Sequence, residues 1–317
     1  MQIWRSLEEV PASLGRTVVT VGNFDGVHRG HQHVVRRARE VARELGDLPV
    51  VAVTFDPHPI AVLRPEHAPQ TLSSLETRAA LLGDAGVDEV LAVPFSRDVA
   101  GWSPERFVAD VLVDALHARA VVVGANFRFG TKASGDVATL VRLGAVHDFS
   151  AEGIALDGGP QVWSSTYVRS CLAAGDVEGA AEALGHPFAI RGEVVKGDQR
   201  GRELGYPTAN VPTSPGCAAP SDGVYAGWLR RLDDPPAAAL PAAISVGTNP
   251  TFEGERERRV ESYILDRDDL ELYGVEVEVT FAARIRGMLR FDSVEELVLR
   301  MHDDVERCRV LLGLTGG

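Results

Sequence analysis

The sequence predicts an α/β protein of two domains, an N-terminal domain with a parallel sheet and a C-terminal antiparallel β-barrel with a terminal helix. Up to about residue 186, continuous apolar runs of strand length alternate with stretches of helical periodicity, which is typical of a parallel sheet covered on both faces. Beyond Gly185-His186-Pro187 the apolar runs shorten and are separated by Gly, Pro and Asp, as in a compact antiparallel barrel or sandwich. We therefore expect domains at residues 1–186 and 187–317.

The elements of the N-terminal domain follow from local patterns. The first strand, Thr17–Gly22, is rich in β-branched residues. In the next segment, His31–Gly46, apolar residues recur at the spacing of one helix face. Ser103 and Pro104 fit the N-cap and the first position of a further helix. The other strands and helices that we expect are Pro49–Phe55, Leu75–Ala85, Glu89–Phe95, Ser103–Leu116 and Arg119–Gly124.

In the C-terminal domain the expected strands are short, and Pro, Gly and Asp lie between them. Turns are expected at Thr213–Gly216 and Asp233–Pro236. Ser293 and Glu296 form a capping-box pattern at the start of the final helix, Ser293–Leu312. The expected strands are Ala189–Lys196, Gly223–Arg231, Ala242–Val246, Arg259–Leu265 and Val275–Arg286.

Composition narrows the function classes. The 317 residues are 45% hydrophobic and 24% charged, an ordinary globular composition, without the ~18-residue apolar run of a membrane helix. The formal net charge of −13 argues against a nucleic-acid partner. The N-terminus lacks a signal pattern, and Cys171, Cys217 and Cys308 are widely spaced without a CxxC, as in a reducing compartment. We expect a cytoplasmic protein without nucleic-acid or membrane partners, and a homo-oligomer is left open.

The turn after the first strand carries two histidines. His28 and His31 lie three residues apart, so on the first turn of a helix they share a face. Ligands of open α/β sheets bind at the carboxyl ends of the strands, and a helix start attracts phosphate. The segment has neither a Walker lysine nor a GxGxxG motif. We predict that both histidines handle the phosphates of ATP in a nucleotidyl-transfer site; the alternative is two solvated histidines.

The element His28-Arg29-Gly30-His31 resembles the HxGH signature of the nucleotidyltransferase superfamily. Ser164–Arg169 is similar to the ISSTxxR motif of that superfamily, with Trp163 in place of Ile. The resemblance implies a Rossmann-like domain in which the histidines stabilise charge on the transferring phosphate, because such transfer depends on positioning and electrostatics. Ser165 and Thr166 also suit a helix start. The ATP site that the resemblance implies is Gly22, Phe24, His28, His31, Ser165, Thr166 and Arg169.

Two further loops follow strands of the same domain. Phe55–Pro59 comes after the second strand, and Gly124–Gly130 comes after the fourth. Both resemble the flavin-site loops of bacterial FAD synthetases. Phe127 and Phe129 could instead pack in the core, and His58 could be a rigid-loop histidine between two prolines. The flavin site that the resemblance implies is Asp56, His58, Asn126 and Phe129.

The C-terminal domain opens with a glycine-bearing segment, Gly192–Asn210, which we expect to be a mobile loop whose backbone can approach phosphate. Its end, Gly205–Asn210, resembles the PTAN motif of riboflavin kinases. Hydroxyl and amide oxygens are suitable ligands for Mg²⁺, and the resemblance implies Thr208 and Asn210 as its protein ligands. The implied loop for ATP and Mg²⁺ contains Gly197, Gly205, Pro207, Thr208 and Asn210.

Glu261 matches the general base of riboflavin kinases. It would take the proton of the ribityl 5′-hydroxyl, provided that it points inward, opposite Ser262, and reaches that hydroxyl. The alternative is an exposed carboxylate paired with Arg258 or Arg259. We expect two late arginines, Arg284 and Arg286, to be solvated; the alternative is that one of them binds phosphate. The matching segments are Asp222–Tyr225, Ser245–Phe252, Val260–Tyr263 and Asp269–Gly274.

The resemblance covers residues 15–310, and the chain is identified as a member of the bacterial bifunctional riboflavin kinase/FMN adenylyltransferases, the prokaryotic FAD synthetases. It implies that the C-terminal, riboflavin kinase-like barrel converts riboflavin and ATP to FMN, and that the N-terminal domain converts FMN and ATP to FAD and pyrophosphate, both with Mg²⁺. One alternative is a single-activity adenylyltransferase of the pantetheine-phosphate or nicotinate type with an accessory barrel. The other is a non-catalytic flavin-binding protein with degenerate sites.

Overall fold

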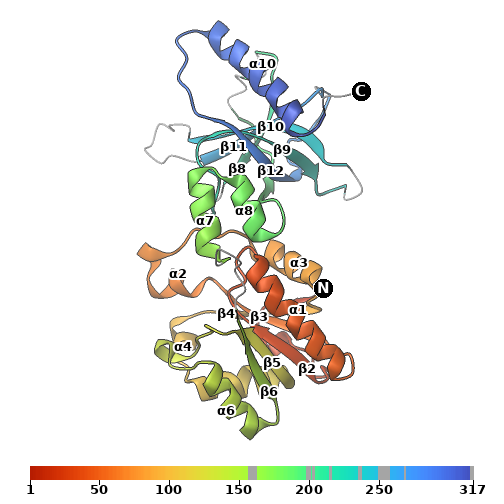
Figure 1. Ribbon diagram of the computed structural model, residues 1–317, viewed down its shortest axis with the longest axis vertical. Coiled ribbons are helices and arrows are strands. Elements are labelled where there is room, and N and C mark those ends of the chain that lie inside the picture. The colour runs from red at the N-terminus through yellow and green to blue at the C-terminus, as the bar shows by residue number, and fades with distance from the viewer. Residues whose placement is uncertain are drawn as a thin grey trace. The chain divides into compact units, whose positions relative to one another are not determined.

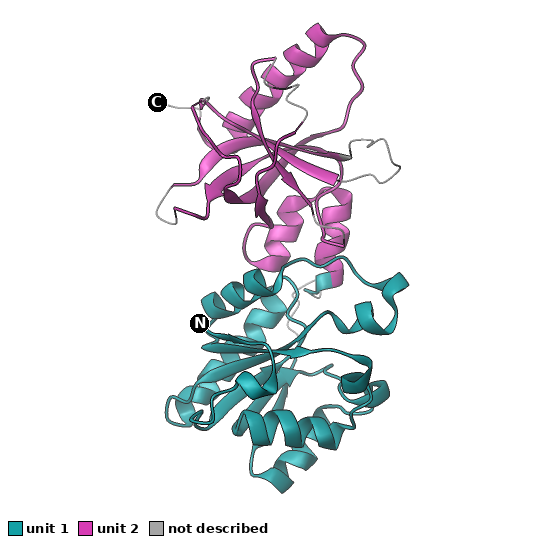
Figure 2. Ribbon diagram, turned by 180° about the vertical axis from the view of Figure 1, so that it is seen from behind, with its two compact units in different colours: residues 1–165 teal, residues 166–317 magenta. Residues whose placement is uncertain are grey.

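The computed structural model describes residues 1–155, 163–197, 201, 204–213, 216–234, 238–248, 258–267 and 269–314. The chain divides into two compact units, residues 1–165 and 166–317, and each is described by itself (Figures 1 and 2). Within the described residues, no helix is both long and apolar enough to cross a membrane.

The first unit is built on a six-stranded sheet in which every described pairing is parallel, as the sequence predicts (Figure 1). The strand order is β1-β4-β3-β2-β5-β6. From β2 the chain passes to β3 and β4 on one side and later to β5 and β6 on the other, so the order reverses at β2, where ligands of such sheets bind. The strands are β1 (Ile3–Trp4), β2 (Thr17–Val21), β3 (Val50–Asp56), β4 (Glu89–Pro94), β5 (Ala118–Gly124) and β6 (Ser150–Ile154).

Helices cover both faces of this sheet. On one face α1 (Arg29–Glu44) and α3 (Leu75–Ala85) bury Val35 and Leu82 against Val18 and Val50. On the other face Leu112 and Leu140 pack on Val19 and Val21. These two layers explain why the strands are apolar throughout. The remaining helices are α2 (Pro59–Leu63), α4 (Arg97–Ala100), α5 (Pro104–Phe107), the π-helix η3 (Val108–Ala115), α6 (Val137–His147) and the short turns η1 (Leu7–Glu9), η2 (Pro65–His67) and η4 (Thr131–Ala133).

The second unit contains a six-stranded antiparallel sheet of order β7-β12-β9-β10-β11-β8. Its two edges meet where the Val195 amide donates to the Asn210 carbonyl at 2.9 Å. The sheet is thus a near-closed barrel, as predicted. The elements are α7 (Ser165–Ala174), α8 (Val177–Leu184), β7 (Ala189–Glu193), β8 (Thr208–Pro212), β9 (Gly223–Arg231), β10 (Leu240–Thr248), β11 (Arg258–Ile264), β12 (Glu276–Gly287) and α10 (Val294–Leu311).

The terminal helix α10 packs on one face of the barrel, where Val305 and Cys308 join Val224 and Ala226 in a buried cluster. Ser293 caps it by accepting from the Glu296 amide at 3.1 Å. The Glu296 carboxylate accepts from the Asp292 amide, one residue before the cap. The predicted cap is therefore confirmed, while the reciprocal bond of the capping box is shifted by one residue.

Helices α7 and α8 belong to the second unit. The Arg284 guanidinium donates to the Ala174 carbonyl at 2.9 Å, and the Ser221 amide donates to the Leu172 carbonyl at 2.8 Å. These bonds fix α7 to the barrel. They explain why the second compact unit begins at Thr166, close to the start of α7. The domain boundary between residues 186 and 187, which we expect from sequence, concerns the two activities and stays a prediction.

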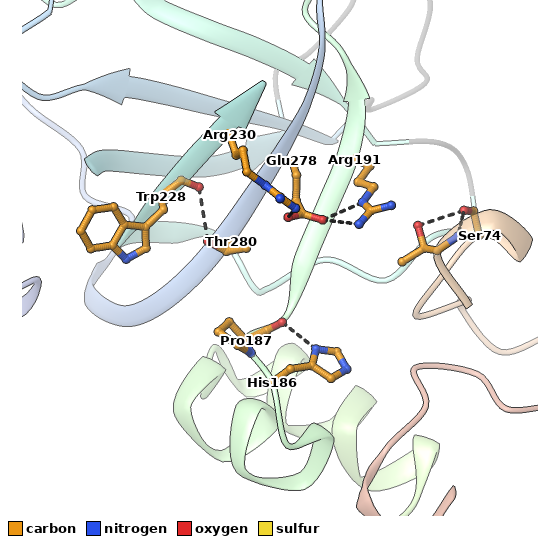
Figure 3. A network of polar contacts seen from close by, with 9 residues as sticks. Ser74, His186, Pro187, Arg191, Trp228, Arg230, Glu278 and Thr280 are labelled. Carbon is orange, nitrogen blue, oxygen red and sulfur yellow. Dashed lines mark hydrogen bonds and ion pairs between the residues drawn. The ribbon is translucent and has the colours of Figure 1, made fainter. Parts of the chain in front are cut away.

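On the barrel sheet, Glu278 of β12 lies between two arginines (Figure 3). It accepts from Arg191 of β7 at 2.6 Å and from Arg230 of β9 at 2.7 Å. Burial opposes the charge of Glu278, but the hydrogen bonds from Arg230 and Arg191 together outweigh it, so the pKa of this carboxyl lies below its ordinary value. This cluster joins three neighbouring strands.

Candidate active sites

The histidine turn, residues 22–28, connects β2 to α1. The backbone of Phe24 and of Val27 has positive φ angles of 49° and 41°, which a β-branched residue such as Val27 rarely adopts. Gly22 lies against the Phe24 ring, since a Cβ at Gly22 would come within 3.2 Å of it. His28 ends the turn as the N-cap residue of α1. The turn is thus a tightly folded connection at the carboxyl end of the central strand.

The two predicted histidines lie against each other. The rings of His28 and His31 stack with centroids 3.6 Å apart, and the Phe24 ring meets that of His31 edge-on at 5.2 Å. Gly30 makes this stacking possible, because a Cβ there would lie 3.1 Å from the His28 ring and 3.3 Å from the Trp163 carbonyl. His28 is buried, so the interpretation of two solvated histidines is wrong.

The His31 ring has the electrostatics of a neutral group. Burial first, and then the neighbouring His28 and Arg78, hold the pKa of His31 well below its ordinary value. Its buried Nδ1 has no hydrogen-bond partner within the described part of the chain. A neutral imidazole can still donate one hydrogen bond to a phosphate oxygen.

Asp25 braces the histidine turn, a role that the sequence analysis did not identify. Its buried carboxylate accepts from the amides of Leu72 and Ser73 at 2.9 and 3.1 Å. Its backbone carbonyl accepts from the Ser165 hydroxyl at 2.9 Å. The structure therefore brings Ser165 to the histidine turn. Thr166 and Arg169 follow in α7 and belong to the second unit.

The loop after β3 also meets the histidine turn. His58 is the N-cap of α2, where its Nδ1 accepts from the Ile60 amide at 3.2 Å. Its Nε2 lies 3.2 Å from the amide nitrogen of Asn23. Asp56 is exposed at the end of β3, before a cis bond to Pro57. The structure thus brings His58 into the histidine site through Asn23, which the sequence analysis did not single out.

The loop after β5 divides its residues between surface and core. Asn126 is exposed. Phe129 is buried among the core residues, where it stacks on Phe127 at 5.4 Å and packs against Phe107 at 5.6 Å. Core packing, the alternative left open above, describes Phe129, whereas Asn126 and Arg128 are exposed polar side chains of this loop.

In the second unit, the sheet register pairs the candidate metal ligand with the candidate base. Asn210 of β8 lies directly opposite Glu261 of β11, which lies opposite Ser245 of β10. Directly paired residues share a face, so Glu261 is half-buried on the face of β11 that points away from Ser262. The expectation that Glu261 points inward is therefore wrong, because Val260, Ser262 and Ile264 occupy the buried face. Arg258 pairs with Asp222 at 2.8 Å.

Thr208 and Asn210 lie in strand β8, so the expected mobile loop ends before them. The three central residues of this strand, Ala209, Asn210 and Val211, are all buried. The Asn210 amide donates to the Thr208 carbonyl at 3.1 Å and lies 3.4 Å from its hydroxyl. Gly197 passes so close that a Cβ there would lie 2.6 Å from the Asn210 side-chain oxygen. The Gly197 backbone thus packs against the Asn210 side chain, and the oxygen atoms of Thr208 and Asn210 are of the type that fits Mg²⁺.

Two other loop positions have simple roles. Gly205 has a φ of +86°, which favours glycine, and Pro207 is half-buried just before β8. Tyr206 between them packs edge-on against Tyr263 at 5.1 Å. The segment Ser245–Phe252 falls in part outside the described residues.

Arg286 is not the solvated arginine that we expect from sequence. It forms a bidentate ion pair with Asp304 of α10 at 2.7–3.0 Å, with side chains only 16% and 8% exposed. The pair lies on a cavity of about 290 Å³ between β12 and α10. Arg286 also pairs in register with Val224, which pairs with Ser245. Asn210, Glu261, Ser245, Val224 and Arg286 therefore form one row across the barrel face that α10 covers.

Family models match both units in the expected order. An FAD synthetase model matches residues 10–164, and a riboflavin kinase model matches residues 184–312. The bifunctional riboflavin kinase/FMN adenylyltransferase of Escherichia coli K12 is 38% identical over 94% of this chain and 93% of its own. That of Pseudomonas fluorescens is 38% identical over 98% of both chains.

A solved structure extends the likeness to the whole fold. The crystal structure of a protein from Streptococcus pneumoniae, described as a macrolide-efflux protein, superposes with a TM-score of 0.86 at 32% identity. The superposition covers 97% of this chain and 98% of the S. pneumoniae chain. Given two family models in this order and relatives that match along almost the whole length, the chain belongs to the family of bifunctional riboflavin kinase/FMN adenylyltransferases.

Proposed function

We propose that this chain phosphorylates riboflavin to FMN with ATP and then adenylylates FMN to FAD with a second ATP. The observation that carries the proposal is the order of the two enzyme models, each matching a unit that holds the corresponding candidate site. A single-activity adenylyltransferase would not account for the riboflavin kinase match. The flavin chemistry of the curated relatives also outweighs the efflux description of the S. pneumoniae protein.

For adenylyl transfer we assign the histidine turn to the phosphates of ATP. An oxygen of the FMN phosphate attacks the α-phosphorus, a P–O bond to the outer phosphates breaks, and pyrophosphate leaves. The nucleophile is already an anion, so the step needs charge stabilisation more than a general base. His28 and His31 are the donors placed for that task. Gly22, Phe24, Ser165, Thr166 and Arg169 complete the proposed ATP site, and Asp56, His58 and Asn126 the flavin side.

For riboflavin phosphorylation we assign Glu261 as the general base. Its carboxylate would take the proton of the ribityl 5′-hydroxyl as that oxygen attacks the γ-phosphorus of ATP and ADP leaves. Thr208 and Asn210 would hold Mg²⁺, which offsets charge on the phosphates when bound. The pairing of Asn210 with Glu261 across β8 and β11 supports this arrangement, because the residue proposed as base and the residue proposed as metal ligand are neighbours in the strand register.

The wider setting is part of the same proposal. We expect Mg²⁺ dependence of both reactions, a cytoplasmic protein without nucleic-acid or membrane partners, and functional domains at residues 1–186 and 187–317. A homo-oligomer remains open. The proposed substrates of this protein are all small molecules: riboflavin, FMN and ATP.

The test is to incubate the purified chain with riboflavin, ATP and Mg²⁺ and to separate the flavins by chromatography. FMN should appear first and FAD later, and chelation of Mg²⁺ should stop both. FMN without FAD would contradict the assignment of the first unit, and FAD made only from supplied FMN would contradict that of the second. If neither FMN nor FAD is formed, the result would favour the alternative of a non-catalytic flavin-binding protein.

A further inference from the structure

Arg78 of α3 is a buried charge in the first unit. It is 4% exposed, and burial holds its pKa below the ordinary value against the opposing effect of Asp25, Asp56 and Glu76. An arginine stays protonated in proteins, so the charge persists. Within the described chain it forms no ion pair, and its Nε has no hydrogen-bond partner. A buried charge with only neutral partners is costly, and its position therefore calls for a reason.

The uncharged hydrogen-bond partners of Arg78 lie near the start of the loop after β3, and through them Arg78 is linked to the histidine turn. Its guanidinium donates to the Thr54 hydroxyl at 3.1 Å and reaches the Phe55 carbonyl at 3.5 Å, both near the end of β3. The Thr54 hydroxyl in turn donates to the Asn23 carbonyl at 3.1 Å. Asn23 then contacts His58 at 3.2 Å through its side chain. One continuous chain of contacts thus joins α3, the histidine turn and the loop after β3.

Arg78 also acts on the histidine pair through its charge. The charged or titratable groups acting on His31 are His28 and Arg78, and Arg78 itself faces Asp25, Asp56 and Glu76. Next to burial and His28, the fixed positive charge of Arg78 disfavours a second positive charge on His31. It also adds a positive potential to a site that handles phosphates, at no cost of reorganisation during the reaction.

We propose that Arg78 is a positioning residue for adenylyl transfer: through the Thr54 hydroxyl it holds the histidine turn and the loop after β3 in register, and its positive charge acts on the histidine pair. The proposal rests on the adenylyl transfer assigned above to the first unit. It goes beyond that assignment because Arg78 lies on a helix that neither sequence motif includes.

Three variants separate the two parts of this role. Arg78→Met removes the hydrogen bonds and the charge, Arg78→Lys keeps the charge, and Thr54→Val removes only the link between the turns. FAD formation from supplied FMN and ATP is measured for kcat and KM. The His31 ring is titrated by NMR, with His31→Gln to assign its signals. Arg142→Met, an exposed arginine of the same unit, is the matched control and should behave as wild type.

In Arg78→Met we expect kcat/KM for FAD formation to fall by about 100-fold, as displaced reacting groups commonly cost. The His31 titration should move to higher pH. Arg78→Lys should return that titration to the wild-type position and recover part of the rate. Thr54→Val should raise the KM for FMN while leaving the His31 titration unchanged. Thermal unfolding of each variant shows whether the first unit is folded.

A folded Arg78→Met variant with wild-type kinetics and an unchanged His31 titration would overturn the proposal. If Arg78→Met does not fold, Thr54→Val decides: an unchanged KM for FMN would overturn the link between the turns. A wild-type chain that forms no FAD would instead overturn adenylyl transfer itself. The two failures are therefore distinguishable.

Discussion

Asn210 and Glu261 lie directly opposite each other on neighbouring antiparallel strands. They are 51 positions apart in the sequence, yet the register fixes them side by side on one face of the barrel. A slip of one residue would turn Glu261 to the face of Ser262, which is fully buried. The kinase assignments therefore depend on strand register as much as on residue type.

Replacing Glu261 by Gln should stop FMN formation and leave FAD formation from supplied FMN intact. The amide has the same shape but cannot accept the proton, and loss of a general base commonly costs about 10²–10⁴-fold in rate. Chromatographic rates of both steps provide the measurement. Equal loss of both activities in a folded variant would refute the division of labour between the units.

Replacing Gly197 by Ala should weaken the kinase through Asn210. The new Cβ would come 2.6 Å from the Asn210 side-chain oxygen, which has to move. We expect a higher KM for Mg-ATP in FMN formation and an unchanged rate of FAD formation. Gly15→Ala is the control, because nothing lies within 4 Å of its added Cβ. If Gly197→Ala keeps the wild-type KM, the site around Asn210 does not bind the nucleotide.

Replacing His28 by Ala should abolish FAD formation while FMN accumulates from riboflavin. The variant loses the ring that stacks on His31 and, with it, the donor that we propose for the transferring phosphate. Loss of one such donor typically costs about 10²–10³-fold in kcat. The exposed His147 provides the control, and His147→Ala should retain both steps. Normal FAD formation by the His28 variant would remove the histidine pair from the mechanism.

Replacing Glu278 by Gln should destabilise the barrel near pH 7 by about 1–3 kcal/mol, the usual value of hydrogen bonds to a charged group. The pKa of Glu278 is lowered in the folded state. Its contribution is therefore present above the unfolded pKa of about 4.3, and is lost as the pH falls through the folded value. Calorimetric melting near pH 7 and near pH 3 measures this difference, with the exposed Glu306→Gln as control. A constant difference at both pH values would show that the charge is not responsible.

The strongly periodic elements of the fold could be predicted from the sequence. Strand β2 and helix α1 carry patterns that tertiary packing only reinforces, and the structure places them within a few residues of the expected bounds. The edge strand β6, with the sequence SAEGI, was not predicted because an edge strand is half-exposed and its pattern resembles a loop. We expected strand β8 to be the end of a mobile loop because glycines precede it, but its central residues Ala209, Asn210 and Val211 are all buried.

For the site, residues within motifs could be predicted, whereas the residues that hold them could not. His28, His31 and Glu261 stand in recognisable segments. Asp25, Asn23 and Arg78 contact partners far away in the sequence: Ser165, which bonds to Asp25, is 140 positions from it, and Arg78 reaches Asn23 only through Thr54. No local pattern reveals such contacts, because they exist only once β2, β3 and α3 are packed.

Helix α7 has a consequence for exchanging parts between relatives. Its first residue, Ser165, bonds to Asp25 beside the histidines, while Ala174 at its end accepts from Arg284 of the barrel. A chimaera joined after Ser165 would give the ISSTxxR-like segment to two different parents, and one joined at residue 186 would break the match between α7 and β12. A recombinant enzyme with a foreign kinase half therefore has to keep an arginine at the position of Arg284 together with the native α7, because this side chain bonds to the helix end.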